Sequence, residues 1–190
     1  MEAIRFVILG CVFGYACELF FKIVAPISLG GVLVIVLFYP LYTLFVYHSG
    51  NRLLSYFTRT VPATILYYVL YGCLGLTLEW VFMNNSPWGN PDASQSAMFS
   101  FWATIALAPR ILLNKNPGVR RVKIGIVVFF ACYVIASAAT LLLTEGATEF
   151  VSIIYLMIIG YNGLNIFYFW YFVRLRRVES TTQAGALSRE

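Results

Sequence analysis

Charged residues are scarce in this chain. Of its 190 residues only 11% are charged, whereas 61% are hydrophobic. A typical soluble domain has about 25% charged and about 45–50% apolar residues. A soluble protein of this length could not bury so much apolar surface. The composition therefore excludes a soluble enzyme, a disordered chain, a collagen and a disulfide scaffold, and it predicts an all-α integral membrane protein.

Residues that bind metals or carry out catalysis are also few. The chain has one histidine, His48, and its four cysteines have no Cys-x-x-Cys spacing. These counts exclude a zinc site of the His₃ or Cys₂His₂ type. The sequence also lacks an aspartate-rich motif and the Gly-x-x-x-x-Gly-Lys-Ser/Thr phosphate loop. We therefore expect no metal, no cofactor and no catalytic residue, and an ATPase partner would have to be a separate subunit.

Six apolar runs are long enough to cross a membrane, which requires roughly 20 residues each. Polar or Gly/Pro-containing segments separate them. The predicted spans are residues 5–25, 29–47, 61–83, 97–113, 124–143 and 150–173. The second span is expected to end before Ser49-Gly50-Asn51, which puts His48 beside a loop. The pattern predicts a six-helix transmembrane domain over residues 1–174 and a short, polar, disordered tail over 175–190.

The basic residues support this count of spans. With six spans, all 13 lysines and arginines except Lys22 lie on the side that holds both termini. Because loops rich in lysine and arginine stay in the cytoplasm, both termini are predicted to be cytoplasmic. The membrane that we expect for the protein is the cell membrane. Arg110 is expected to extend to the same interface. The net charge of +5 is thus a topology signal, and no nucleic-acid partner is expected.

Two of the predicted helices share a motif. The segments GYACELFF and GLTLEWVF both match Gly-x-x-x-Glu-x-x-Phe, and they place Glu18 and Glu79 in the outer half of the membrane. The helix that follows each motif carries a proline, Pro40 or Pro109, toward its cytoplasmic half. The pattern indicates a parallel duplication of a two-helix hairpin, and such repeats are common in transporters.

The two glutamates are candidates for a substrate or ion pathway. A carboxylate at membrane depth is costly and usually faces the interior of the bundle. Glu18 can pair with Lys22 one turn away. Glu79 has no basic residue three or four positions away, so it needs a partner on another helix, interfacial water or a proton. The alternative is a structural role, as an interhelical hydrogen-bond anchor.

The sixth span has a polar face near its midpoint. Asn162 and Asn165 are three residues apart and so lie on one side of the helix. We predict that they line the same pathway. The alternative is that they join helices by hydrogen bonds worth roughly 0.6–2 kcal/mol each. Candidate partners are Ser100 and Thr104 on the fourth span and Ser137 and Thr140 on the fifth.

Small residues mark candidate packing sites on the first and third spans. Gly10 and Gly14 form a Gly-x-x-x-Gly step, and Gly72 and Gly75 occupy a similar part of the third span. Glycines at this spacing allow another helix to approach closely, so we predict helix packing at all four positions.

The order of several motifs resembles that of a known family. The chain carries GYACE at residues 14–18, YPLY at 39–42, LEW with a following Phe at 78–82, and PW at 87–88. Over about residues 10–110 this order resembles the ABC-transporter type IV, or CmpB-like, family of small multi-pass membrane proteins. Members of that family usually continue Asp-Tyr-Ser after the loop element, whereas this chain reads Gly89-Asn90-Pro91. The resemblance implies a transporter-like protein but little chemistry.

Three functional hypotheses follow. The first, which we favour, is a small-solute or ion permease or a transporter-like subunit that uses the glutamates and the Asn pair. The second is an accessory or scaffold protein that binds other membrane proteins. The third is a membrane-embedded enzyme acting on a lipid or isoprenoid with paired carboxylates as acid and base, which the absence of an activated nucleophile disfavours. The expected partners are the lipid bilayer and a membrane-protein or ATPase subunit, and the sequence leaves open whether the chain forms an oligomer.

Overall fold

The chain folds into a bundle of six long helices. The computed structural model describes residues 1–24, 29–82, 85–89 and 94–187, with the backbone alone for 181–187. Within these residues there is no strand. The helices are α1 (Glu2–Val24), α2 (Leu29–Ser55), α3 (Thr60–Phe82), α4 (Gln95–Leu113), α5 (Arg120–Leu143) and α6 (Gly146–Leu187), with a short 3₁₀ turn, η1 (Pro117–Val119), before α5. All six are long and apolar enough to cross a membrane, so the predicted all-α six-helix bundle is confirmed.

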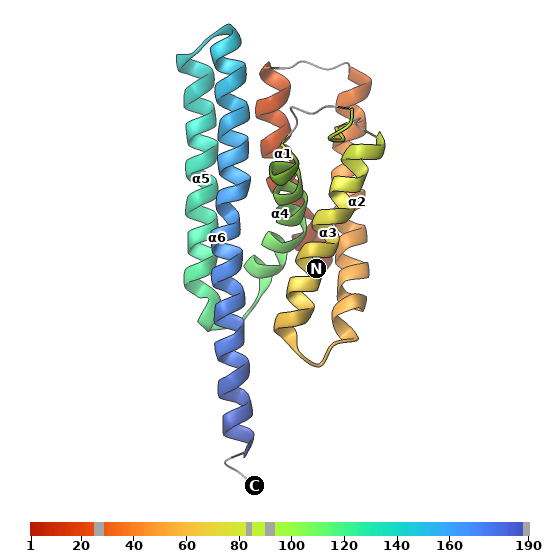
Figure 1. Ribbon diagram of the computed structural model, residues 1–190, viewed down its shortest axis with the longest axis vertical. Helices are drawn as coiled ribbons and strands as arrows, with labels where there is room; N and C mark the ends of the chain where they lie inside the picture. The colour runs from red at the N-terminus through yellow and green to blue at the C-terminus, as the bar shows by residue number, and fades with distance from the viewer. Residues whose placement is uncertain (25–28, 83–84, 90–93, 188–190) are drawn as a thin grey trace.

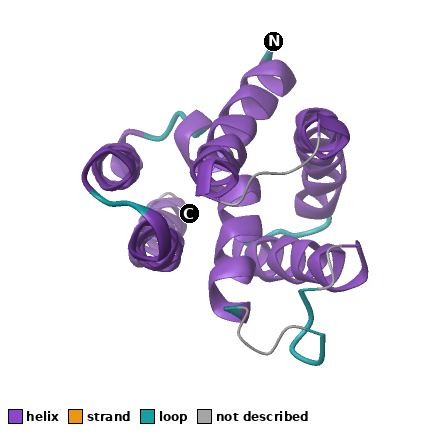
Figure 2. Ribbon diagram, turned by 90° about the horizontal axis from the view of Figure 1, so that it is seen from above, coloured by secondary structure: helices purple, strands orange, loops and turns teal. Residues whose placement is uncertain are grey.

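The helices form two groups. The helices α5 and α6 make a long antiparallel pair beside the group formed by α1 to α4 (Figures 1 and 2). The α2–α3 and α4–α5 connections lie at the same end, which we call the basic end because Arg52, Arg59, Lys115 and Arg121 are in or next to these connections. The last residues of α1 and α3 and the first residues of α2 and α4 lie at the other end.

The α4 helix lies at the centre of the bundle and packs against α1, α3 and α6. It is the shortest of the six candidate spans and the least apolar by composition, yet the largest share of it is buried. Its buried residues include small ones, which let neighbouring helices approach closely. These are Ser100, Ala103, Thr104, Ala106 and Ala108. Because other helices shield α4 from lipid, its sequence needs less hydrophobicity than the outer spans.

The end of α2 differs from the prediction. The helix continues through Ser49-Gly50-Asn51 to Ser55, so His48 lies inside a helix and not beside a loop. Gly50 faces the ring of Tyr67 on α3, and a Cβ atom at this position would overlap the ring. The glycine that signals a break in the sequence therefore serves close packing between α2 and α3.

The C-terminal segment also differs from the prediction. It was expected to be disordered from residue 175, but α6 continues as a helix to Leu187. Extension of an existing helix is cheap because only its nucleation is costly, and no proline interrupts this segment. At 1.5 Å per residue the helix is about 63 Å long, about twice the ~30 Å hydrocarbon core of a bilayer. Its end projects beyond the other helices (Figure 1).

A contact with α3 holds the projecting part of α6. The Glu179 carboxylate accepts hydrogen bonds from the backbone N–H groups of Thr60, at 2.5 Å, and Val61, at 3.2 Å. These are the first residues of α3, whose N–H groups have no partner within their own helix. Glu179 therefore caps a helix that begins 119 residues earlier in the chain.

Glu179→Gln tests this cap. Loss of the negative charge at the positive end of α3 should lower the free energy of unfolding by about 0.5–1 kcal/mol. The measurement is the melting temperature in mild detergent. Glu145→Gln, which changes an exposed carboxylate in the α5–α6 connection, is the control and should melt like the wild type. Equal melting of all three proteins would show that the cap contributes nothing.

Candidate functional site

Glu18 and Glu79 line one small cavity between α1, α2, α3 and α4. Its volume is about 20 Å³, which is room for about one water molecule. The other lining residues are Val34, Ile35, Phe38, Tyr39 and Trp102. The two glutamates come from different helices, and α2 and α4, which pack against both α1 and α3, enclose the space between them. Two positions that only share a motif in the sequence thus meet in the fold.

Each carboxylate accepts a hydrogen bond from a buried aromatic side chain. The Tyr39 hydroxyl donates to Glu18 Oε1 at 2.8 Å, and Trp102 Nε1 donates to Glu79 Oε1 at 3.1 Å. The centroids of the two donor rings are 5.9 Å apart. The donors come from equivalent helices of the two hairpins, Tyr39 from α2 and Trp102 from α4. The sequence did not predict either donor as a site residue. The one signal for them is their similar spacing from the glutamates, 21 residues for Tyr39 and 23 residues for Trp102.

The glycine of each motif makes room for the donor ring. A Cβ atom at Gly14 would lie 2.9 Å from Tyr39 Cδ1, and a Cβ atom at Gly75 would overlap the indole of Trp102. In both hairpins the glycine one turn before the glutamate therefore seats the ring that donates to that glutamate. This common arrangement gives a physical reason for the Gly-x-x-x-Glu part of the repeat.

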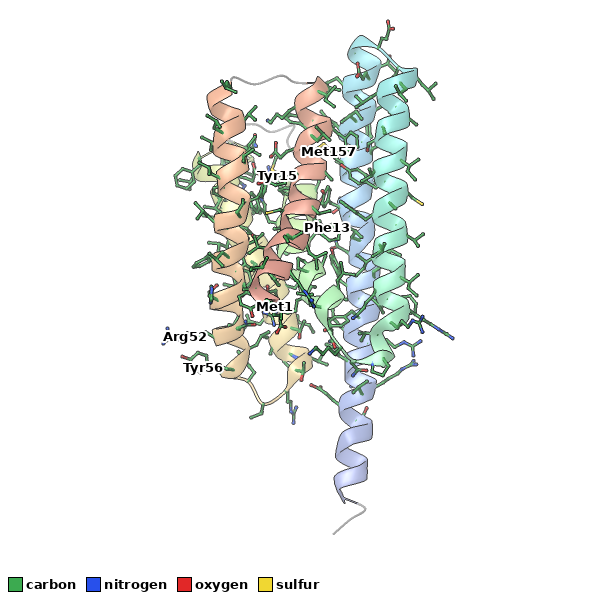
Figure 3. The ribbon with its side chains drawn as sticks, turned by 180° about the vertical axis from the view of Figure 1, so that it is seen from behind. Met1, Phe13, Tyr15, Arg52, Tyr56 and Met157 are labelled. Atoms are coloured by element: carbon green, nitrogen blue, oxygen red, sulfur yellow. The ribbon has the colours of Figure 1, made fainter. Side chains whose placement is uncertain are left out.

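The other two glycines also lie at close helix contacts. Gly10 faces Thr43 of α2 and the backbone oxygen of Ile105 in α4, and Gly72 faces the ring of Phe99 in α4. Tyr15, one residue after Gly14, points from α1 toward α2 and donates to the backbone oxygen of Val36 at 2.7 Å (Figure 3). The side of α1 that carries the glycines is thus packed tightly against its neighbours.

The charges around the cavity are unbalanced. Lys22 Nζ lies 3.7 Å from Glu18 Oε2, and the side chains of both residues are about one quarter exposed. Glu18 Oε2 itself is buried and has no hydrogen-bond partner among the residues that the structure describes. Glu79 Oε2 accepts a hydrogen bond from Asn85 Nδ2 at 2.8 Å, and no described cation lies within ion-pair distance of it. Of the two carboxylates only Glu18 therefore has a described ion-pair partner, and the site has excess negative charge whenever both are ionised.

Asn162 and Asn165 do not line this cavity. Ser100 on α4 donates to Asn162 Oδ1 and accepts from Asn165 Nδ2, both at 2.8 Å. The Tyr68 hydroxyl on α3 donates to Asn165 Oδ1 at 2.7 Å. The two amides thus join α6 to α4 and α3 through side-chain hydrogen bonds, and the structure does not bring them together with the glutamates.

The candidate partners of these amides divide into two groups. Ser100 and Thr104 on α4 both bond to α6, the latter by accepting from the Tyr168 hydroxyl at 2.9 Å. Thr140 on α5 donates to a backbone oxygen of its own helix, and the buried hydroxyl of Ser137 has no partner among the described residues. Of the four candidate partners, the two on α4 therefore bond to α6 and the two on α5 do not.

Ser100→Ala tests the amide network against Ser137→Ala as its control. Both serines are buried, at 2% and 0% exposure, but only Ser100 forms interhelical hydrogen bonds. Losing two such bonds should lower the free energy of unfolding by about 1–3 kcal/mol. Ser137→Ala removes an unpartnered hydroxyl and should be neutral or slightly stabilising. Equal losses for the two variants in thermal unfolding would contradict this assignment.

The chemistry available at the cavity is that of acceptors and aromatic faces. Two carboxylates can hold a proton or a small cation, and the rings of Phe38 and Tyr39 present faces that attract cations. Among the described residues, no group of three or more His, Cys, Asp or Glu side chains could hold a metal ion. The cavity therefore offers carboxylate oxygens and aromatic rings as binding groups.

Comparisons of the chain with known proteins found no match. No protein-family model matches the chain, and no curated protein or solved structure matches it significantly. The resemblance of residues 10–110 to the ABC-transporter type IV family thus stays a prediction. What the structure defines is a class of protein, a helical bundle whose six helices are each long and apolar enough to cross a membrane.

Proposed function

We propose that this protein is a small-ion permease, or the transporter-like subunit of one, and that a monovalent cation or proton binds between Glu18 and Glu79. The observation that carries the proposal is that both carboxylates line one cavity, while among the described residues only Glu18 has an ion-pair partner, Lys22. Carboxylates at membrane depth usually mark ion pathways and proton relays. The resemblance to a family with a transporter name is in keeping with this proposal.

The size of the cavity favours an ion over a larger solute. A volume of about 20 Å³ accommodates about one water-sized occupant. A lipid or isoprenoid substrate would not reach both carboxylates within it, which disfavours the enzyme hypothesis. The Asn pair has no part in this proposed pathway, because both amides are engaged in hydrogen bonds between helices.

Flux measurements on the purified protein in liposomes test the proposal. The wild type should dissipate an imposed gradient of at least one of H⁺, Li⁺, Na⁺ or K⁺ faster than protein-free liposomes do. Glu79→Gln should lower this flux by about 10- to 100-fold while its melting temperature stays near that of the wild type. Normal flux through Glu79→Gln would contradict the proposal, as would a wild type that conducts none of the four ions. A variant that loses stability but keeps the flux would instead support the structural-anchor alternative.

A further inference from the structure

Arg110 lies in the last turn of α4, near the basic end, and is half-buried. Its guanidinium carbon is 4.8 Å from the centroid of the Tyr67 ring and 6.0 Å from that of Phe6. Its Nη2 donates to Asn51 Oδ1 at 2.7 Å. Three neighbouring helices, α1, α2 and α3, therefore contribute one contact each, and the side chain is held in place instead of extending freely into water.

This arginine lacks a counter-charge within the described part of the chain. Its Nε atom is buried, and no described residue forms a hydrogen bond with it. No described carboxylate lies within ion-pair distance of the Arg110 side chain. Among the described residues, the ion pair found is the one between Lys22 and Glu18. A guanidinium stays charged under all physiological conditions, and a buried charge usually requires a partner of opposite sign. The contacts around Arg110 thus provide aromatic faces and an amide but no anion.

An apolar groove lies between α1 and α2. Ala3, Ile4, Val7 and Ile8 of α1 and Pro40, Leu41 and Leu44 of α2 line a groove with a volume of about 290 Å³. Val7 follows Phe6, whose ring contacts the Arg110 guanidinium. Leu44 lies two turns before Asn51 on the same face of α2. The groove therefore includes the chain neighbour of Phe6 on α1 and ends on α2 about 10 Å along the helix from Asn51.

The basic end itself is surrounded by positive charge. Arg52 follows Asn51 directly, and Arg52 and Arg59 are exposed (Figure 3 shows Arg52 and Tyr56 at this end of α2). In a protein that spans a membrane, a ring of basic residues lies at the level of the lipid headgroups. A guanidinium without a described counter-charge and an apolar groove nearer the middle of the same two helices are complementary to a molecule with an anionic head and an apolar tail.

We propose that Arg110 and Asn51 bind the headgroup phosphate of an anionic phospholipid, with one of its acyl chains in the α1–α2 groove. Arginine suits this role because its planar fork of N–H donors matches the oxygens of a phosphate group. The assignment is independent of the proposed ion pathway, because it uses the other end of the bundle and none of the same side chains.

Thermal unfolding in mild detergent tests the lipid site. Phosphatidylglycerol, added at increasing concentration, should raise the melting temperature of the wild type, whereas phosphatidylcholine and inorganic phosphate should not. Arg110→Gln should lose this response. Arg121→Gln, which removes an exposed charge from the same end of the bundle, should keep it.

A conservative variant covers the case in which Arg110→Gln does not fold. Arg110→Lys retains the charge but loses the planar fork, so it should need at least about tenfold more phosphatidylglycerol for the same rise. A wild-type response by Arg110→Gln or by Arg110→Lys would overturn the proposal. So would an equal rise with phosphatidylcholine, or a rise with inorganic phosphate alone, which would mean a soluble anion at Arg110 and not a lipid.

Discussion

Glu18→Gln and Glu79→Gln are each expected to lower the ion flux through the reconstituted protein by about 10- to 100-fold. A charge-assisted contact contributes about 1.5–3 kcal/mol, and every 1.4 kcal/mol corresponds to about a factor of ten. Glutamine keeps the shape of the side chain and can still accept the hydrogen bond from Tyr39 or Trp102. The substitutions therefore remove the charge and leave most of the packing in place.

The double variant distinguishes one site from two. Because both carboxylates line the same cavity, their effects should not multiply, and the double variant should be no more than a few-fold worse than the poorer single variant. Glu145→Gln, remote from the cavity, serves as the control and should conduct like the wild type. Multiplied losses in the double variant would indicate two separate barriers, and unchanged flux in either single variant would remove that glutamate from the pathway.

Gly75→Ala should be the most destabilising of the substitutions considered for the helix contacts. The new Cβ atom would overlap the indole of Trp102. That ring has little freedom to move, because it packs against Tyr42, with centroids 4.8 Å apart, and Phe38, at 5.8 Å, and also donates to Glu79. Overpacking of this kind costs about 1–3 kcal/mol, and the lost hydrogen bond adds about 1 kcal/mol.

Two comparisons make the Gly75 measurement specific. Cys73→Ala changes an exposed residue of the same helix and should melt like the wild type. Gly14→Ala should lower the melting temperature less than Gly75→Ala, because its Cβ atom would approach the Tyr39 ring at 2.9–3.2 Å without the deeper overlap found at Gly75. A Gly75→Ala protein that melts like the wild type would show that the contact between α3 and α4 is looser than described.

Much of the fold could be predicted because a membrane sets the minimum length of each apolar run that crosses it. The six apolar runs match the six helices, since an apolar run of roughly 20 residues satisfies all its backbone hydrogen bonds within a bilayer by forming a helix. The central position of α4 could not be predicted from the sequence. Low hydropathy is equally typical of a helix that does not cross the membrane and of a membrane-spanning helix that other helices shield from lipid. The predicted end of α2 was wrong. In a sequence, Gly50 is typical of a helix break, whereas in the fold it makes room for the Tyr67 ring.

The site was predictable only in part. The repeated motif pointed to Glu18 and Glu79, because a carboxylate inside an apolar run is unusual. Their shared cavity depends on how α2 and α4 pack between α1 and α3, and no periodicity in the sequence encodes that packing. The Asn pair was singled out by the same reasoning, but a polar face on a helix does not reveal whether it meets a cavity or a serine such as Ser100.

The packing of each aromatic donor ring against a glycine links three positions of the chain. The glycine, the glutamate one turn later, and the tyrosine or tryptophan 21 or 23 residues after that depend on one another, because a larger residue at the first position displaces the donor from the second. Such a triplet should change together during evolution while the surrounding lipid-facing residues drift. Two copies of this three-residue pattern in successive hairpins therefore form a query for chains whose overall identity to this one has disappeared.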